Sequence, residues 1–438
     1  MTYQEAVEYL YTQTPLFQNV GQEAYKEGLY NTVTIDRHLG CPHKLFKTIH
    51  VAGTNGKGSV SHTLAAILQA SGLKTGLYTS PHLTDFRERI RVNGKPVSPD
   101  YVVRFIQDNR EFLEPLHPSF FEVTTAMAFS WFAEQEVDVA VIETGLGGRL
   151  DCTNIITPAL SIITNIGYDH MKFLGDTLSQ IAFEKAGIMK KNVPVVIGEH
   201  TPETRAVFER KAEEVGTKIV FAQDNCKIIS HKYFSPGKVI YETVSLPALE
   251  SGLAGLCQEK NANTILTALE VLQQNRKFTF QEQAIRKGFK DVCRMTGLRG
   301  RWQLVSKKPD IICDTGHNSH GLKYIAQHLE ELSSKPGFGQ LRIVMGMVND
   351  KDVSDVLALM PRNARYYFTQ ASVKRALEAS SLRDMARQAG LTGRVYGTVA
   401  QAVSAAQREA SAQDLIFVGG STFVVADLLT MPEFFIHG

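Results

Sequence analysis

Short runs of apolar residues alternate with longer amphipathic segments along most of the chain from Thr48 onward. Parallel strands that are buried on both faces read as continuous apolar runs, and the helices between them carry one apolar face. The alternation therefore predicts an α/β fold in which helices cover both faces of a mostly parallel sheet. The strands expected in the first part are Thr48–Ala52, Gly76–Thr79, Val137–Ile142, Leu160–Thr164, Val195–Ile197 and Lys218–Phe221. The helices expected there include Ser59–Ala70 and Thr125–Glu134.

The pattern changes in the second half of the chain. A less regular stretch from Cys226 to Leu249 predicts antiparallel strands, and helical periodicity returns from Gln258 to Lys290. A Gly- and Arg-rich segment, residues 297–302, ends this helical region, and a second alternation of strands and helices follows. Its expected strands are Asp310–Cys313, Leu341–Met345, Ala364–Phe368, Arg394–Tyr396 and Leu415–Val418. We place a boundary near Thr296, so that residues 1–295 form a doubly wound domain and residues 296–438 a smaller Rossmann-like α/β domain.

Composition narrows the class of protein. A chain of 438 residues is long enough for about two to three domains. Charged residues make up 21% and nearly balance at a net charge of +2, with no basic cluster, so nucleic acid is not an expected partner. The first ten residues lack the features of a secretory signal, and no apolar run reaches membrane-spanning length. We therefore expect a cytoplasmic protein without a membrane partner, whose six scattered cysteines are reduced.

Residues 50–61, His-Val-Ala-Gly-Thr-Asn-Gly-Lys-Gly-Ser-Val-Ser, join an expected strand to an expected helix. Glycines let the backbone turn its N–H groups toward an anion, and the helix N-terminus adds the positive end of its dipole. Lys57 would supply a charge to the outer phosphates of a nucleotide and Ser59 a hydroxyl near its metal ion. The segment is a variant P-loop, since Val51 occupies the usual first glycine position. The alternative, a tight strand-to-helix turn, leaves Lys57 unexplained.

Polar side chains follow two further strands. Glu143 comes directly after an apolar run, where ligands bind in doubly wound sheets, and a carboxylate there could hold magnesium. It could equally cap the glycine turn that follows. His170 comes after the next strand and could be a metal ligand or an ordinary hydrogen-bonded surface residue. The glycines at 145–148 match a dinucleotide-binding pattern poorly, because leucine stands where the third glycine belongs.

The residues alone do not decide the roles of Lys185, Arg299 and Arg301. Asp176 or Thr177 is expected to start a helix whose last turn holds Lys185, just before an expected C′ glycine, Gly187. A cation there stabilises a helix C-terminus by roughly 0.3–1 kcal/mol, which would explain Lys185 without any catalytic role.

In the second half, residues 313–318 bring polar groups to another strand end. Arg299 and Arg301 upstream could close over a triphosphate or could simply be solvated.

Three blocks in order give the chain a resemblance to folylpolyglutamate synthase/dihydrofolate synthase, a branch of the Mur ligase family of ATP-dependent amide-forming enzymes. The blocks are His50–Ser59, Thr79-Ser80-Pro81-His82-Leu83 followed by Glu88-Arg89-Ile90, and Glu143 to Asp151. Weaker blocks that agree are Phe121-Glu122, Asn165-Ile166-Gly167 with Asp169-His170, Glu184 to Ile188, Gln258 with Asn261, Asp314 with His317-Asn318, and Asp350-Lys351-Asp352.

The resemblance implies a role for each matching position. The ATP phosphates would be bound by Asn55, Gly56, Lys57, Gly58 and Ser59. Two magnesium ions are implied, one held by Ser80 and Glu143 and the other by Glu143 and His170. Lys185 matches a lysine that the family carbamylates, which would turn a cation into an anion that orients the second ion.

The resemblance also implies the substrate contacts. Asn261, Arg301 and Asp314 match nucleotide-binding positions, the last two from the C-terminal glutamate-ligase domain. Ser119, Phe121 and Asp151 fall where family members contact the pterin or pteroate group, and His317 lies near the expected glutamate pocket. Lys57, His170, Lys185 and His317 would be the catalytic set.

The implied reaction adds L-glutamate to dihydropteroate or to the terminal glutamate of a reduced folate through an acyl phosphate, in folate biosynthesis and one-carbon metabolism. We expect a monomer whose only partners are these small molecules. Alternatives are a Mur-type ligase of cell-wall precursor synthesis, a P-loop ATPase without ligase activity, and a nucleotide-binding scaffold.

The chain departs from the family pattern at three places. It has Arg299-Gly300-Arg301 for Pro-Gly-Arg, and Asp-Thr-Gly-His-Asn-Ser from Asp314 for Asp-Gly-Ala-His-Asn-Pro. Neither change removes a charged group. The segment from Phe17 to Arg37 matches the family poorly, so no site is assigned there.

Overall fold

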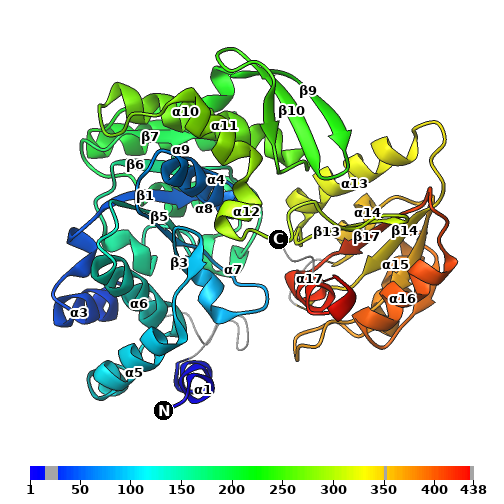
Figure 1. Ribbon diagram of the computed structural model, residues 1–438, viewed down its shortest axis with the longest axis horizontal. Coiled ribbons are helices and arrows are strands. Elements are labelled where there is room, and N and C mark those ends of the chain that lie inside the picture. The colour runs from blue at the N-terminus through cyan, green and yellow to red at the C-terminus, as the bar shows by residue number, and fades with distance from the viewer. Residues whose placement is uncertain (15–27, 350–352, 435–438) are drawn as a thin grey trace. The chain divides into compact units, whose positions relative to one another are not determined.

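The computed structural model describes residues 1–14, 28–349 and 353–434, so part of the poorly matching N-terminal segment and the Asp350-Lys351-Asp352 block lie outside the described residues. The chain divides into two compact units (Figure 1). The first comprises residues 1–230, 242–249 and 260–297, and the second comprises residues 231–241, 250–259 and 298–438. Because the second unit also takes in two segments from before Thr296, the single boundary expected there stays a prediction.

An eight-stranded sheet forms the centre of the first unit, in the order β4-β3-β2-β5-β1-β6-β7-β8. Neighbours are parallel from β2 to β8, and only the β2–β3 and β3–β4 pairs are antiparallel. The strands are β1 (Lys47–Ala52), β2 (Thr75–Tyr78), β3 (Ile90–Val92), β4 (Lys95–Pro96), β5 (Val139–Glu143), β6 (Leu160–Ile163), β7 (Val195–Ile197) and β8 (Ile219–Phe221). The six strands expected from the sequence are all confirmed, and their ends differ by at most two residues.

Helices surround this sheet. They are α1 (Tyr3–Gln13), α3 (Tyr30–His38), α4 (Lys57–Ala70), α5 (Pro99–Leu113), α6 (Phe120–Glu134), α7 (Met171–Leu174), α8 (Leu178–Ala186), α9 (Pro202–Val215), α10 (Cys257–Gln274), α11 (Glu282–Lys290) and α12 (Val292–Thr296). Helix α4 is buried from Ser59 to Leu68, and α11 packs closely on it. Gly288 permits this approach, because a Cβ atom there would lie 2.7 Å from the Cα of Ile67.

A small three-stranded sheet follows the first sheet in the chain, in the order β11-β10-β9. Its strands are β9 (Ile228–Ser235), β10 (Lys238–Thr243) and β11 (Leu249–Ser251). Strands β9 and β10 lie in the stretch from Cys226 to Leu249 in which the irregular sequence pattern predicts strands, and β11 begins at its last residue.

The second unit contains a six-stranded sheet in the order β12-β13-β17-β14-β15-β16, parallel except for β12. The strands are β12 (Gln303–Ser306), β13 (Asp310–Asp314), β14 (Leu341–Met345), β15 (Ala364–Phe368), β16 (Gly393–Val395) and β17 (Leu415–Gly419). Its helices are α13 (Ser319–Ser333), α14 (Val353–Leu359), α15 (Ala379–Gln388), α16 (Val399–Glu409) and α17 (Thr422–Leu429). This arrangement confirms the predicted fold class, with a second α/β sheet after the first.

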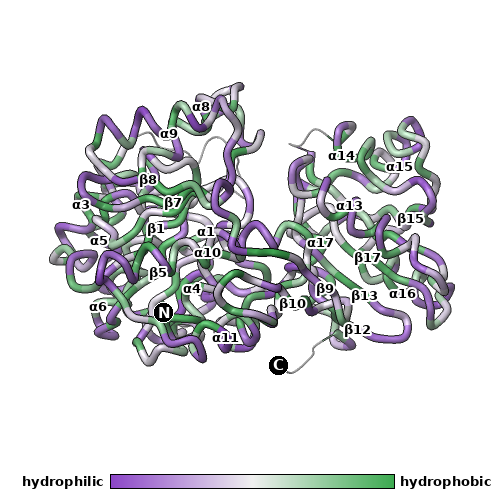
Figure 2. The backbone as a smooth tube through the Cα atoms, turned by 90° about the horizontal axis from the view of Figure 1, so that it is seen from above, coloured by the Kyte–Doolittle hydropathy of each residue, from purple (hydrophilic) through white to green (hydrophobic). Residues whose placement is uncertain are grey.

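The hydrophobic residues are concentrated along the central strands of the two large sheets. Figure 2 shows the tube in green along central strands of each sheet and in purple over many surface loops. In β1 every residue after Lys47 is buried, as expected for a central parallel strand. Within the part of the chain that the structure describes, we find no helix with the length and apolar character needed to cross a membrane.

A buried ion pair joins β14 to the start of β17. Arg342 Nε lies 2.8 Å from Asp414 Oδ2, and each side chain is only 5% exposed. Burial opposes ionisation of Asp414, but hydrogen bonds from Ser411, the backbone N–H of Gln340 and Arg342 outweigh it and hold the pKa of this carboxyl below its usual value. Removing Asp414 would take the closer of two carboxylates from a buried arginine, since Glu409 Oε2 lies 3.6 Å from Arg342.

We therefore expect Asp414→Ala to lower the free energy of unfolding by about 3 kcal/mol or more. Chemical denaturation with a probe in the second unit measures it. Asp384→Ala is the matched control, because Asp384 pairs with Arg383 at an exposed site and should contribute no more than about 1 kcal/mol. Equal losses in the two variants would contradict the expectation.

Candidate active site

At two positions in the loop between β1 and α4, the backbone has a conformation that only glycine adopts readily. Gly53 has φ 145° and Gly56 has φ 83°, and both values lie in the region that disfavours side chains. A Cβ atom on Gly53 would lie 1.9 Å from the hydroxyl oxygen of Thr164. The helix begins at Lys57, with Gly56 as its N-cap. The glycines thus let the chain turn from the strand directly into the helix, as the P-loop interpretation requires.

Polar residues that follow β6 hold this loop in place. The side chain of Thr54 donates to the carbonyl of Gly167 and accepts from its N–H, at 3.1 and 3.0 Å. The Asn55 N–H donates to Asn165 Oδ1 at 2.9 Å, and the Thr164 hydroxyl donates to the Asn55 carbonyl at 2.6 Å. The loop therefore keeps its shape through contacts from the neighbouring strand end.

Two lysine side chains meet at one carbonyl oxygen of the loop. Lys57 Nζ donates to the Gly53 carbonyl at 3.0 Å and to the Thr54 carbonyl at 3.2 Å. Lys185 Nζ, in the last turn of α8, donates to the same Gly53 oxygen at 2.9 Å. Lys185 is 4% exposed, and its burial, reinforced by the charge of Lys57, lowers its pKa to about 7. The surroundings of Lys185 thus favour the neutral amine more than water does.

Glu143 lies at the carboxyl end of β5, next to the end of β1. Val51 pairs with Glu143 across the two strands, and the carboxylate accepts a hydrogen bond from the Ser80 N–H at 3.3 Å. Both the glutamate and Ser59 of α4 are buried. No cluster of three or more His, Cys, Asp or Glu suited to a metal occurs among the described residues. A single carboxylate, Glu143, with serine hydroxyls nearby fits magnesium, which takes one or two carboxylates and completes its shell with phosphate oxygens and water.

His170 is the N-cap residue of helix α7 and has a left-handed conformation, with φ 51°. Its Nε2 lies 3.9 Å from Asp169 Oδ1, and about a third of its side chain is exposed. Its assignment to a second metal ion stays a prediction.

The glycine loop after Glu143 is held by Asp151. The carboxylate accepts from the N–H groups of Gly145 and Leu146, both at 2.8 Å, and also from Thr153. Burial raises the pKa of Asp151 above its usual value despite these bonds. Asp151 thus shapes the loop. Its contact with the pterin stays a prediction.

The other two predicted pterin residues lie at the start of α6. The ring of Phe121 covers Gly145, where an added Cβ would lie 2.5 Å from it, and stacks obliquely on Tyr78. Ser119 is the N-cap of α6 and exchanges hydrogen bonds with Glu122, so its side chain has a structural role. Asn261 of α10 faces the phosphate loop, since a Cβ on Gly56 would lie 2.3 Å from its Oδ1. The structure therefore brings Phe121 and Asn261 to the loops that follow β5 and β1.

The remaining predicted residues belong to the second unit. Asp314, at the end of β13, accepts from the N–H groups of Trp302 and Gly316, both at 2.7 Å, and burial raises its pKa. Asp314 thus ties the loop that carries Arg301 to its strand end. The Nδ1 of His317 lies 3.0 Å from the Thr315 carbonyl oxygen.

The glycine expected at the C′ position, Gly187, is the C-cap residue of α8, with a φ of −61°. Glycine is needed there because a Cβ would lie 2.3 Å from the Cα of Arg149, in the glycine loop. Two residues that support the site, Thr164 and Asn165, were not among the predicted site residues. Their signal was similar to that of Glu143, because Thr164 is the last residue of an expected buried strand and Asn165 comes directly after it.

Family models match two regions of the chain. The Mur ligase middle domain covers residues 51–269, and the Mur ligase glutamate ligase domain covers residues 300–422. The dihydrofolate synthase/folylpolyglutamate synthase of Escherichia coli is 31% identical over 420 residues, covering 95% of this chain and 94% of its own. The chain belongs to the folylpolyglutamate synthase/dihydrofolate synthase branch of the Mur ligase family. Members of this family are ATP-dependent ligases.

Other relatives agree. The folylpolyglutamate synthase of Lacticaseibacillus casei is 31% identical, covering 93% of this chain and 96% of its own. E. coli FolC in complex with DHPP and ADP has a TM-score of 0.81 at 29% identity, covering 98% of this chain and 97% of its own. A bifunctional folylpolyglutamate synthase/dihydrofolate synthase with Mn, AMPPNP and L-glutamate bound has a TM-score of 0.79 at 28% identity, covering 98% of this chain and 97% of its own.

We expect Gly56→Ala to weaken binding of the ATP analogue AMPPNP at least about tenfold, because the left-handed backbone alone costs roughly 1–2 kcal/mol with a side chain present. The added methyl group would also displace Asn261. Calorimetric titration in the presence of magnesium measures the affinity. Gly72→Ala is the matched control, because Gly72 has φ 86° but nothing within 4 Å of its Cβ position. It should lose stability and keep normal affinity, and equal affinity in both variants would argue against the expectation.

Proposed function

We propose that this protein is a ligase that uses ATP to join L-glutamate to dihydropteroate, to the terminal glutamate of a reduced folate, or to both. The observation that carries the proposal is the loop from Gly53 to Lys57, with Lys57, Lys185 and the Glu143 strand end around it, in a chain of this family. ATP would phosphorylate the pteroate or folate carboxylate to an acyl phosphate. The amine of glutamate would attack that carbonyl carbon, release phosphate and leave an amide.

The chain's own residues would act by positioning and by charge. Residues 55–59, with the Lys57 ammonium among them, would bind the phosphates, and Lys57 would neutralise charge on the transferring phosphoryl group. Magnesium bound by Ser80 and Glu143, with His170 at a second ion, would supply further neutralisation. Asn261, Arg301 and Asp314 are proposed for the nucleotide, Ser119, Phe121 and Asp151 for the pterin, and His317 for glutamate. A cytoplasmic location and a monomeric state stay predictions from the sequence.

Lys185 is proposed to carry a carbamate. Its neutral amine would attack carbon dioxide, form an N–C bond and release one proton, giving an anion in place of a cation. Two features support this: the side chain is buried, and the Lys57 ammonium at the same carbonyl oxygen disfavours a second positive charge. A carbamate would relieve that repulsion and offer oxygen atoms to the magnesium site.

The test of the function is release of ADP in the presence of magnesium, with and without each co-substrate. We expect release to require both glutamate and a pteroate or reduced folate, offered in parallel. Lys57→Ala should lose turnover at least a hundredfold while its circular dichroism spectrum and melting temperature stay close to wild type, because the Lys57 side chain donates to two carbonyls of its own loop. ADP release that is independent of both co-substrates would indicate a simple ATPase instead.

Lys185→Ala should lower kcat about 10- to 100-fold, because losing a group that supports a metal site typically lowers activity by about this factor. Formate or acetate added to the assay should partly restore it, because a small carboxylate can enter the space of the missing carbamate. Lys185→Arg should stay inactive in the same solutions, since its fixed charge and bulk occupy that space. An Arg variant with wild-type turnover would leave Lys185 with only a stabilising role at the helix C-terminus.

A further inference from the structure

A chain of hydrogen bonds leads from the phosphate loop to Glu199, a residue just beyond β7. The backbone N–H of Asn55 donates to Asn165 Oδ1 at 2.9 Å, and Asn165 Nδ2 donates to Glu199 Oε1 at 3.3 Å. The other carboxylate oxygen of Glu199 accepts from Lys260 on α10. Asn165 is only 6% exposed, so its amide has little access to water.

The chemistry of these groups makes Glu199 decisive for the direction of the Asn165 amide. An amide side chain has one end that accepts and one end that donates, and the two ends can exchange by rotation. A carboxylate only accepts, so the NH₂ group of Asn165 must face Glu199. Its oxygen atom must then face the N–H of Asn55. The reversed amide would place two acceptors together at Glu199 and two donors together at the loop.

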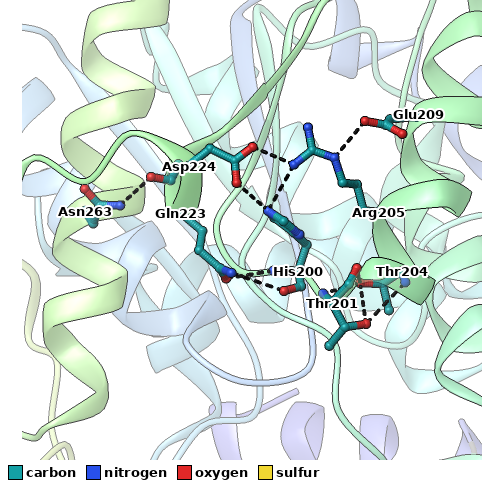
Figure 3. A network of polar contacts seen from close by, with 9 residues as sticks. His200, Thr201, Thr204, Arg205, Glu209, Gln223, Asp224 and Asn263 are labelled. Atoms are coloured by element: carbon teal, nitrogen blue, oxygen red, sulfur yellow. Dashed lines mark hydrogen bonds and ion pairs between the residues drawn. The ribbon is translucent and has the colours of Figure 1, made fainter.

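The backbone around Glu199 is held independently of this side chain. The N–H groups of Gly198 and Glu199 donate to the carbonyls of Ile163 and Thr164, at 2.8 and 2.9 Å. On the other side, Figure 3 shows His200 bound to Gln223 and Asp224, with Arg205 closing the same network. Neighbouring side chains thus have separate tasks: His200 joins the ends of β7 and β8, whereas Glu199 reaches back toward β6 and the phosphate loop.

The Lys260 ion pair does not account for Glu199 by itself. Lys260 is 47% exposed, and ion pairs at such sites contribute little. The ion pair holds the Glu199 carboxylate toward α10, where Asn261 directly follows Lys260. Glu199 therefore contacts both the segment after β6, which carries Asn165, and helix α10, and both of these border the phosphate loop.

We propose that Glu199 is a positioning residue for nucleotide binding, which fixes the Asn165 amide so that the loop at Asn55 keeps its phosphate-binding shape. The inference rests on the proposed function in one respect, namely that the loop binds the nucleotide. Simple electrostatics predicts the opposite effect. Removing a carboxylate near an anion site should strengthen anion binding, whereas loss of the positioning bond should weaken it.

Titration calorimetry of the full chain with AMPPNP and magnesium separates these outcomes without turnover. Glu199→Met, which keeps the length of the side chain but has no acceptor oxygen, should weaken binding about tenfold, or about 1.4 kcal/mol. Glu199→Gln, whose amide oxygen can still accept from Asn165, should stay within about threefold of wild type, since a hydrogen bond between neutral groups replaces a charged one. In steady-state assays the Met variant should raise the KM for ATP more than it lowers kcat.

Glu203→Gln is the control for charge. Glu203 lies four residues further on in α9 and bonds Ser179, so its loss should leave AMPPNP affinity unchanged or slightly stronger. The double variant Glu199→Met/Asn165→Leu should bind no more weakly than Asn165→Leu, because both changes break one chain of bonds. If the Met variant does not fold, Glu199→Asp, which is one methylene shorter, replaces it with the same expectation.

Affinity in Glu199→Met equal to or stronger than wild type overturns the inference, as does an equal loss in Glu199→Gln. Failure of the proposed function looks different: the wild-type protein itself would then not bind AMPPNP or would release ADP without glutamate.

Discussion

The convergence of two lysine side chains on the carbonyl oxygen of Gly53 is the interaction on which the candidate site depends. Gly53 has a positive φ, and the Thr164 hydroxyl lies where a Cβ would otherwise be, so glycine is needed at this position for two reasons. The convergence also requires that the end of α8 approach the glycine loop at Arg149, which Gly187 permits. Two ammonium groups so close to each other are unfavourable unless one is neutral or becomes an anion. Burial, reinforced by the charge of Lys57, lowers the pKa of Lys185, and the proposed carbamate would remove the second positive charge altogether.

The site is shared among the ends of several parallel strands, and each strand end has two tasks. One side chain faces the phosphate loop, and a neighbour fastens the strand end to the rest of the sheet. Glu143 ends β5 and Thr144 follows it, Thr164 and Asn165 follow β6, and Glu199 and His200 lie just beyond β7. The Thr144 N–H continues the ladder to Val51, and the Glu199 N–H continues it to Thr164. Rigid backbone hydrogen bonds thus carry the polar groups to within reach of one loop.

The second unit repeats this principle in a simpler form. Asp314 ends β13, and its two hydrogen bonds to backbone N–H groups hold the loop that carries Arg301 and the turn that leads to His317. A carboxylate used this way supports neighbouring residues through the backbone. The charged residues that the family pattern singles out in both units, Asp151 and Asp314, therefore stabilise loops in addition to any contact with substrate.

The sequence by itself determined the α/β class, the order of the strands along the chain and the phosphate loop, because strand burial and glycine-rich turns leave local patterns. Residues 195–197, 341–345 and 364–368 were predicted with the observed ends for that reason. The tertiary structure alone decided that Lys185 reaches Gly53, that Gly187 serves close packing and not a left-handed turn, and that Glu199 orients Asn165. Each of these joins residues far apart in the chain, and the spacing of residues along a sequence carries no information on which strand ends become neighbours in a sheet.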